Sequence, residues 1–485
     1  MVGEKDRQSN FFDYLVYGRH IPQDHELAKI QREVDFSFVK EETKDLYEEG
    51  IGRPSWPPEV LFRMLFLEYY ANLSDVQVCE QCGYNMLYRW FVGLEVGDKT
   101  PDDTTLVVFR KRLGNERIER LFERVVEQAK AKGLLVGRYK ILDATHVIAD
   151  VAIPSTVGLL RGARRKVLKA IGKKYPKRAA ELKGSYGVGD PKGRRATEEE
   201  LMKEVALTRE LFSSAKGKYT KKVDQIIEGL QKMLYGQEKI ASLSDADARF
   251  GYKDEDHPFC GYKVPIACDE SELVTSLEVF PGNENEGAEK HVRSLLEKED
   301  GSGIRSQAVV ADALYDSAEN RKAIHEKQLK AYIPSRQKKS DRFRYVRAED
   351  QVYCPARQAS MGKSPHEQGF LYYFSVESCR GCPYQDGCPP LNGRRVRVFV
   401  SHDYQLKLLD EDSERKEALR KRGMVERRFG SGKKWHRLNR ARYRGKWRVT
   451  IQALMTFLVM NVKRMVKLLS QWGDNAQILP ALEAG

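Results

Sequence analysis

The stretch RYKILDATHVIADV, residues 138–151, marks a change of periodicity in the chain. Apolar residues before it recur at helical spacing, whereas this stretch is rich in β-branched residues and predicts a β-strand. Asp143 lies in its apolar part, between Leu142 and Ala144. A carboxylate in a strand otherwise suited to burial is costly unless it is paired or binds a cation. We therefore expect Asp143 to have a partner in the folded protein.

Working outward, the residues that follow predict the rest of a sheet. Four further strands are predicted, at residues 262–269, 273–280, 307–311 and 331–334. The first two are separated by a short turn and form a hairpin candidate. Helices are predicted before and after the third of these strands, at residues 286–298 and 316–328. A hairpin followed by strand–helix–strand predicts a mixed α/β sheet rather than a barrel or a sandwich.

The other parts of the chain are arranged around this sheet. The sequence predicts four regions: a helical region at 1–130, a sheet domain formed by 138–335 plus 406–470, a basic helical insertion at 155–240, and a Cys-rich insertion at 336–405. The short helices of the first region are compatible with a helix-turn-helix-like DNA-binding unit. An apolar helix is predicted at residues 446–469.

The chain of 485 residues is basic, with a net charge of +14. Residues 415–448 carry fifteen Lys or Arg and two acids, and residues 161–239 carry twenty-one against ten. Two basic segments on an acidic background predict two contact surfaces for an extended polyanion, most often nucleic acid. The alternative is that these helices present solvated faces. Trp435, Tyr443 and Trp447, which lie among the cations of the second segment, favour contact with bases and sugars.

No segment predicts export or membrane insertion. Residues 1–10 lack the apolar core of a signal peptide, and the longest apolar run, residues 451–462, is shorter than the ~20 residues needed to cross a bilayer. We expect an intracellular protein without a membrane partner. In that compartment eight cysteines indicate metal binding or buried thiols rather than a disulfide framework.

A second carboxylate, Asp312, stands where the strand at 307–311 ends. Carboxylates on two strands of one sheet can converge at its edge and hold Mg²⁺, which prefers carboxylate and phosphate oxygens. Either Asp alone could instead be a turn or cap residue. Asp316 precedes a helix with Glu319 at capping-box spacing, so it is predicted to be a cap. His146, three residues after Asp143, is predicted to face the other side of the sheet as a structural residue.

The third acidic candidate is Glu426, which lies among cations in KRGMVERRFG, residues 421–430. Ion pairing with its neighbours is one explanation. An acid on a helix that faces DNA would repel phosphate, however, and a metal ion between the two removes this objection. Glu426 is therefore a candidate metal ligand.

The late cysteines form a pattern typical of a zinc site. The pattern is C-x24-C-x2-C-x5-C, from Cys354, Cys379, Cys382 and Cys388. Four thiolates suit a tetrahedral structural Zn²⁺, which would stabilise an insertion with few apolar residues for a core of its own. Unligated thiols are the alternative. The remaining four cysteines are predicted to be buried thiols: Cys79, Cys82, Cys260 and Cys268.

The order Asp143, Asp312 and Glu426, with a sheet between the first two and an insertion before the third, resembles the DDE transposases of bacterial insertion sequences. One branch of that family has a signature of Tyr, Arg, Glu and Lys, with two, three and six residues between successive members. Here Arg422, Glu426 and Lys433 match the last three positions, and Leu419 stands at the position of the Tyr.

Other stretches are similar to the same family over roughly residues 45–465, most weakly over 155–240. They include DARFGYKDEDHPFCGYKVPIACDE (247–270), LEVFPGNENE (277–286), VVADALYDSAENRKAI (309–324) and, near the N-terminus, GIGRPSWPPEVLFRMLFLEYY (50–70). Related transposases often have a cysteine cluster between the second Asp and the Glu.

The resemblance implies a ribonuclease-H-like catalytic domain at 138–335 plus 406–470 and a DNA-binding domain at 1–130. It implies a transposase that binds the terminal inverted repeats of its element, cuts the DNA ends and joins them to target DNA. The three acids would hold two Mg²⁺, or Mn²⁺. The residues expected to contact DNA are Arg422, Lys433, Arg427, Arg428 and Lys434. The implied partners are double-stranded DNA and at least one second copy of the chain, in the bacterial cytoplasm at the nucleoid.

Three other functions share part of these features. A ribonuclease-H-like nuclease that only hydrolyses would need the acids, but neither the N-terminal helices nor the insertion at 155–240. A catalytically silent DNA-binding regulator derived from a transposase should have lost an acid, and none is missing. A structural zinc and RNA-binding protein would leave the acids unexplained.

Overall fold

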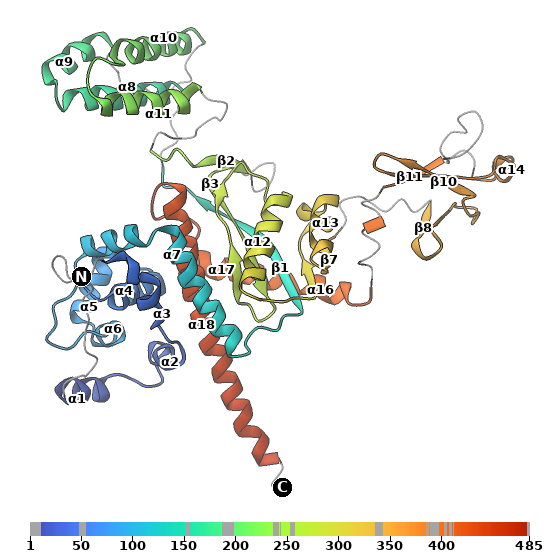
Figure 1. Ribbon diagram of the computed structural model, residues 1–485, viewed down its shortest axis with the longest axis horizontal. Coiled ribbons are helices and arrows are strands. Elements are labelled where there is room, and N and C mark those ends of the chain that lie inside the picture. The colour runs from blue at the N-terminus through green and yellow to red at the C-terminus, as the bar shows by residue number, and fades with distance from the viewer. Residues whose placement is uncertain are drawn as a thin grey trace.

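The computed structural model describes residues 11–47, 55–151, 156–186, 198–235, 244–252, 258–334, 343–384, 397–401 and 412–482, together with positions 242, 388, 405, 406 and 410. Figure 1 shows N-terminal helices packed beside a sheet, and two smaller units that extend away from it. The sheet and the helices around it position the candidate site.

The N-terminal part is helical, as the sequence predicts. Its elements are α1 (Phe11–His20), α2 (Glu26–Glu33), α3 (Phe38–Thr43), the 3₁₀ helix η1 (Lys44–Leu46), α4 (Pro58–Tyr70), α5 (Asp75–Tyr84), α6 (Met86–Val92) and α7 (Asp103–Ala131). Phe36 packs edge-on against Phe66 and Phe91, with ring centroids 5.7 and 6.1 Å apart. Ser74 and Gln77 form a reciprocal capping box that starts α5.

In the described residues the sheet is mixed and has seven strands. They are β1 (Tyr139–Ile148), β2 (Arg249–Tyr252), β3 (Pro258–Asp269), β4 (Val274–Leu277), β5 (Phe280–Pro281), β6 (Ala308–Val310) and β7 (Lys330–Tyr332). The order is β2-β3-β1-β6-β7, and β4 and β5 also pair with β3. β1 is antiparallel to β3 and parallel to β6, which is in turn parallel to β7. This is a ribonuclease-H-like arrangement, and the predicted mixed α/β class is confirmed.

Two local predictions about strands need correction. The segment 273–280 was predicted as one strand, but it contains two, β4 and β5. The strand β2 was not predicted. β2 is short and pairs with β3 alone, through Arg249 opposite Gly261. Strands of so few residues show too little periodicity to be predicted from the sequence. Their formation depends on pairing with the longer strand β3.

Helices cover both faces of the sheet (Figure 1). On one face, α12 (Glu289–Gly301) and α13 (Ala318–Glu326) pack against Leu142 and Val309. On the other, Ile141 and Val310 share a core with α7, α17 (Gly423–Trp435) and α18 (Lys446–Leu482). Neighbouring residues of β1 and β6 thus enter opposite cores, as the two-residue period of a strand requires. α17 packs directly against β1.

The predicted apolar helix is α18, which extends beyond residue 469 to Leu482. Within the described part of the chain, its segment Lys446–Gln471 is long and apolar enough to span a membrane by composition. However, 83% of that apolar window is buried inside the protein. It packs against α2, α4, α7 and β4, so its apolar surface is used by the core that joins the N-terminal helices to the sheet.

The two units that extend from the sheet lie where the sequence predicts insertions. The first contains α8 (Thr156–Gly172), α9 (Pro176–Ser185), α10 (Glu198–Ala215) and α11 (Lys221–Tyr235), which enclose a core of their own. The second contains β8 (Arg344–Val346), η3 (Arg347–Glu349), β9 (Gln351–Tyr353), β10 (Gly362–His366), β11 (Gly369–Tyr373), α14 (Val376–Cys379) and β12 (Arg397–Ser401). We expected it to have few apolar residues for a core, yet Tyr345, Val352, Tyr372, Phe374 and Val400 form a small one.

The prediction that Asp316 caps a helix is wrong. Ser317 caps α13 by accepting a hydrogen bond from the Asn320 amide at 3.2 Å. Asp316 instead forms a fully buried ion pair with Arg321, at 3.0 Å. Arg321 also reaches Asp410 at 3.3 Å, which ties α13 to the chain that follows the Cys-rich insertion.

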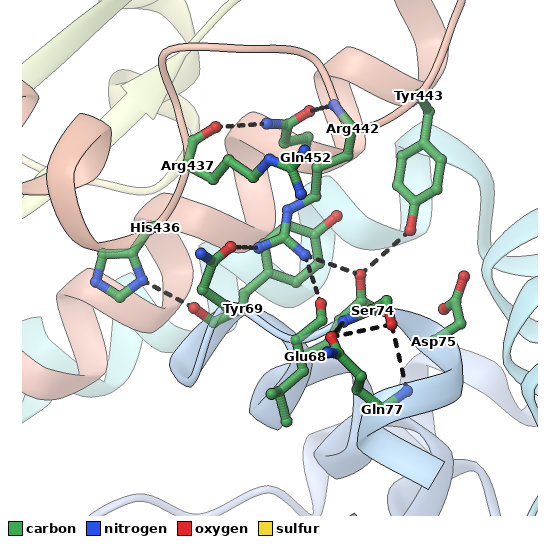
Figure 2. A network of polar contacts seen from close by, with 12 residues as sticks. Glu68, Tyr69, Ser74, Asp75, Gln77, His436, Arg437, Arg442, Tyr443 and Gln452 are labelled. Carbon is green, nitrogen blue, oxygen red and sulfur yellow. Dashed lines mark hydrogen bonds and ion pairs between the residues drawn. The ribbon is translucent and has the colours of Figure 1, made fainter. Parts of the chain in front are cut away.

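A buried polar network connects the N-terminal helices to the chain between α17 and α18 (Figure 2). The Glu68 carboxylate on α4 is fully buried and accepts from Arg110 at 2.7 Å, Arg442 at 3.3 Å and the Tyr443 hydroxyl at 3.2 Å. Nearby, the His436 ring donates from Nδ1 to the Tyr69 carbonyl at 2.8 Å. Each charge of this network is compensated by a partner from a distant part of the chain.

Replacing Glu68 tests how strongly the two parts are coupled. Glu68→Leu leaves two buried guanidinium groups without their shared carboxylate, so we expect the free energy of unfolding to fall by about 3–5 kcal/mol. Urea denaturation followed by circular dichroism measures this change. As a control, Glu181→Ala breaks an exposed pair with Arg178 and should change stability by less than ~0.5 kcal/mol. Unchanged stability of Glu68→Leu would contradict the coupling.

Candidate active site

Strand register brings two of the three predicted acids together. In the parallel pair of β1 and β6, Tyr139 lies opposite Ala308 and Ile141 lies opposite Val310. β6 ends at Val310, and Asp312 follows it at a position that continues this register toward Asp143. The two carboxylates lie close enough to interact electrostatically. Because side chains alternate along a strand, Asp143 faces the same side of the sheet as Ile141, the side that α17 covers.

Asp312 has a local structural role as well. It is the N-cap of the 3₁₀ helix η2 (Ala313–Tyr315), and its side chain accepts a hydrogen bond from the Leu314 amide at 2.8 Å. The cap explanation is therefore correct, and it does not compete with a role at the site. The hydrogen bond fixes the carboxylate at the end of β6, next to Asp143.

The surroundings of Asp143 are unfavourable for a negative charge. Burial raises the pKa of the Asp143 carboxyl to about 6. The neighbouring carboxylates of Asp312 and Glu286 also raise this pKa, whereas the Ala144 amide and the Arg422 guanidinium lower it. Asp143 therefore lies in a half-buried, acid-rich place that favours either a proton or a cation.

Glu286 is a member of this acidic group that our reading of the sequence did not single out, although it ends the quoted stretch 277–286. It lies just before Gly287, where an added Cβ would be 2.3 Å from the Leu314 carbonyl oxygen. The Asn320 side chain donates to the Gly287 carbonyl at 2.8 Å and to the Tyr315 carbonyl at 2.9 Å. Only glycine fits this close approach, which brings Glu286 to η2. Its carboxylate pairs with Lys263 at 3.1 Å.

Glu426 lies in the first turn of α17, on the helix that covers β1, and its side chain is 61% exposed. It pairs with Arg422 at 3.2 Å, so the ion-pair explanation is correct for this structure. Arg422 also interacts electrostatically with Asp143 and so links the two acids through a cation. Within the described ranges, no three His, Cys, Asp or Glu side chains are arranged to hold a metal ion. The three predicted acids therefore do not form a preformed cluster.

The predicted DNA contacts differ in exposure. Arg427 is 66% exposed and pairs with Glu272 at 3.0 Å, while Lys434 lies over the Trp435 ring, 4.6 Å from its centroid. Lys433 is half-buried on α17. Arg428 differs from the surface position that we expected, because it is only 9% exposed.

The four late cysteines lie near one another. Burial raises the pKa of the Cys379 thiol, and the neighbouring Cys354, Cys382 and Cys388 raise it further. Two tight turns present them. Arg357 adopts a φ of 58° where the Cys354 sulfur accepts from the Gln358 amide, and Gly381 adopts a φ of 74° between Cys379 and Cys382. The thiols are thus close enough to interact electrostatically, but in the described residues no three of them are arranged to hold a metal ion. Thiolate sulfur is nevertheless the ligand type that structural Zn²⁺ favours.

Three of the other four cysteines are buried thiols, as predicted. Cys82, Cys260 and Cys268 are buried, and Cys79 is half-buried. Burial raises the pKa of both Cys79 and Cys82 to about 12, so neither thiol ionises near neutral pH. His146 packs against Phe259, with ring centroids 5.0 Å apart.

The sheet order and the adjacent Asp143 and Asp312 define a ribonuclease-H-like protein. Residues 231–462 match the family described as "Transposase DDE domain", and residues 15–112 match "Transposase domain (DUF772)". The chain belongs to the DDE transposase family, which confirms the resemblance noted in the sequence. Members of this family act on DNA and use divalent metal ions.

One relative is an "Uncharacterized protein ORF8 in nfe locus" of Rhizobium meliloti. It is 27% identical over 140 residues, which are 28% of this chain and 66% of the relative. The chain thus spans slightly less than two thirds of that relative's length. No solved structure matches the chain.

The raised pKa of Asp143 predicts a pH-dependent stability. An acid whose pKa is about 6 when folded and near 3.8 when unfolded favours the folded state in its protonated form. Ionisation between pH 4 and 6 therefore removes stability. In buffer without divalent cations, Asp143→Asn should stabilise the protein by about 1–3 kcal/mol above pH 6.5, and the gain should vanish near pH 4.

Urea denaturation at a series of pH values measures this effect. The control Asp150→Asn alters an exposed carboxylate that pairs with Arg440, and it should show no such pH-dependent gain. A gain for Asp143→Asn that is equal at pH 4 and pH 7 would show that the effect is not due to ionisation.

Proposed function

We propose that this protein is the transposase of its own mobile element. It binds the terminal inverted repeats, cleaves the DNA ends, and joins them to target DNA in the bacterial cytoplasm, at the nucleoid. The single observation that carries this proposal is that the Asp143 and Asp312 carboxylates, from the neighbouring strands β1 and β6, interact electrostatically on the side of the sheet that α17 covers. The family match over residues 231–462, which include β2 to β7 and α17 but not β1, supports the same function.

The donor set fits Mg²⁺ or Mn²⁺, because Asp143, Asp312 and Glu426 offer carboxylate oxygens. When bound, two such ions would activate the nucleophile and stabilise the leaving oxygen of an in-line displacement. The metal-free site already favours a cation. Burial and the neighbouring acids make an ionised Asp143 costly, and a cation relieves that cost.

Arg422 has two tasks in this proposal. In the metal-free protein it lowers the repulsion at the site, since its guanidinium pairs with Glu426 and acts on Asp143. When DNA is bound, the same guanidinium is placed to contact a phosphate near the cut. Lys433, Arg427 and Lys434 would add contacts along α17 that position the DNA backbone without reading its sequence.

Replacing each acid tests the site. Asp143→Ala, Asp312→Ala and Glu426→Ala should each abolish cleavage of end DNA in Mg²⁺, while binding stays within a few-fold, and double variants should be no worse than single ones. Gel assays of cleavage and of strand transfer measure both steps. Cleavage without strand transfer by the wild-type protein would favour a ribonuclease-H-like nuclease.

Glu286→Gln is the matched comparison, because Glu286 is the other acid near Asp143. If Glu426 is the third ligand, Glu286→Gln should retain cleavage in Mg²⁺. Cleavage by Glu426→Ala together with its loss in Glu286→Gln would assign the third position to Glu286.

We also propose that Cys354, Cys379, Cys382 and Cys388 bind one structural Zn²⁺. The proximity of the four thiols supports this, as do the two turns that present them. The core of the insertion is small, so a bound metal ion would add to its stability. We propose in addition that at least two copies of the chain act together, since two ends must be joined in one event.

Elemental analysis tests the zinc proposal. The purified protein should contain about one Zn²⁺ per chain, and Cys382→Ser should lose it and expose residues 343–384 to proteolysis. Cys79→Ser alters a thiol on α5 and should retain the metal. Loss of zinc from Cys79→Ser, with retention in Cys382→Ser, would mean that a different set of thiols binds it.

A further inference from the structure

A pocket of about 610 Å³ lies between α2, α17 and α18. Its lining is rich in cations, and these come from all three helices: Lys29, Arg428, Lys463, Arg464 and Lys467. Trp435 and Met460 add apolar surface to it. The pocket therefore combines positive charge from distant parts of the chain with room for a small group.

Arg428 is the unusual member of this lining. Its side chain is only 9% exposed, and its Nε and Nη2 donors have no hydrogen-bond partner within the described residues. A buried donor without a partner costs about 1–3 kcal/mol, and more when it is charged. Among the described residues, the Arg428 guanidinium therefore has two donors for which no acceptor is present.

The lining holds five cations against three acids, Asp24, Glu26 and Glu272, and the last two acids are already engaged by other cations. Glu272 pairs with Arg464 at 3.6 Å and with Arg427 at 3.0 Å, and Glu26 pairs with Lys463 at 3.4 Å. In the part of the chain that the structure describes, neither Lys29 nor Lys467 forms an ion pair. The uncompensated charge of the pocket is positive, so its missing partner is an anion.

The pocket is separate from the carboxylate site. Residues two positions apart on an α-helix are separated by about 200° around its axis, so Arg428 faces away from Glu426. The planar fork of a guanidinium matches the paired oxygens of a phosphate. Trp435, which is 61% exposed at the pocket, offers a flat surface for an attached sugar or base.

We propose that this pocket binds a phosphate group, with Arg428 as its central donor. The group is either a backbone phosphodiester of DNA away from the cleavage site or a free phosphate. The inference does not depend on the proposed transposition chemistry, because phosphate binding can be measured without cleavage.

The first experiment measures thermal unfolding of the full chain in inorganic phosphate and in chloride at equal ionic strength. Phosphate should raise the wild-type melting temperature, and it should not raise that of Arg428→Met. In chloride, Arg428→Met should melt at the same temperature as the wild type or higher, since it removes a buried, unpaired charge. The control Arg32→Met removes an exposed charge from α2 and should respond to phosphate as the wild type does.

An Arg428→Met variant that melts lower in both buffers and still responds fully to phosphate would overturn the proposal, as would a wild type without a response. If Arg428→Met does not fold, Arg428→Lys serves instead, because it keeps the charge and loses the fork. It should bind phosphate about tenfold more weakly or worse, which corresponds to the loss of one charge-assisted hydrogen bond. An unchanged response in Arg428→Lys would equally overturn the proposal.

The second experiment distinguishes the two sources of phosphate. The logarithm of affinity for a random-sequence duplex is measured against the logarithm of salt concentration for the wild type and Arg428→Met. A slope that is smaller by about one unit in the variant assigns the pocket to the DNA backbone. An unchanged slope, with the phosphate response lost, assigns it to free phosphate. An unchanged slope with the response retained overturns the proposal.

Discussion

The pairing of β1 with β3 on one side and with β6 on the other is the constraint on which the rest of the structure depends. It makes β1 the central strand, so Ile141 and Leu142 must each enter a different core. It also brings Asp143 of β1 close to Asp312, which directly follows β6. A shift of one residue in this register would turn Asp143 toward α12 and away from α17.

Long insertions are compatible with this pairing because they fold around cores of their own. Nearly a hundred residues separate β1 from β2, yet the cost of closing a loop grows only with the logarithm of its length. The four helices α8–α11 bury their apolar faces against one another, in a core separate from that of the sheet. The Cys-rich insertion has a much smaller core, and it is the unit where a bound metal ion would contribute most.

α18 and the Glu68 network join the N-terminal helices to the sheet domain. The helix buries apolar residues against both parts, and Glu68 adds a requirement for specific partners, since its carboxylate is acceptable only where Arg110 and Arg442 both reach it. Such a buried pair is weak as a source of stability but selective for one arrangement. The pocket around Arg428 lies next to this joint, so an anion bound there would contact both α2 and α18.

The sequence by itself determined the mixed α/β class, the helical N-terminal part, the places of both insertions, and Asp143 and Asp312 as candidates on two strands of one sheet. These follow from periodicity and from the cost of a carboxylate in an apolar strand, which are local properties. Only the tertiary structure decided the role of Asp316, the burial of Arg428, the pairing of Glu426 with Arg422, and the presence of Glu286 beside Asp143. The burial of Arg428 and the approach of Glu286 to Asp143 depend on which side chains arrive from distant segments, and neither spacing nor composition carries that information. The pairs Glu426–Arg422 and Asp316–Arg321 are local, four and five residues apart, and the geometry of the fold selects the partner of each acid.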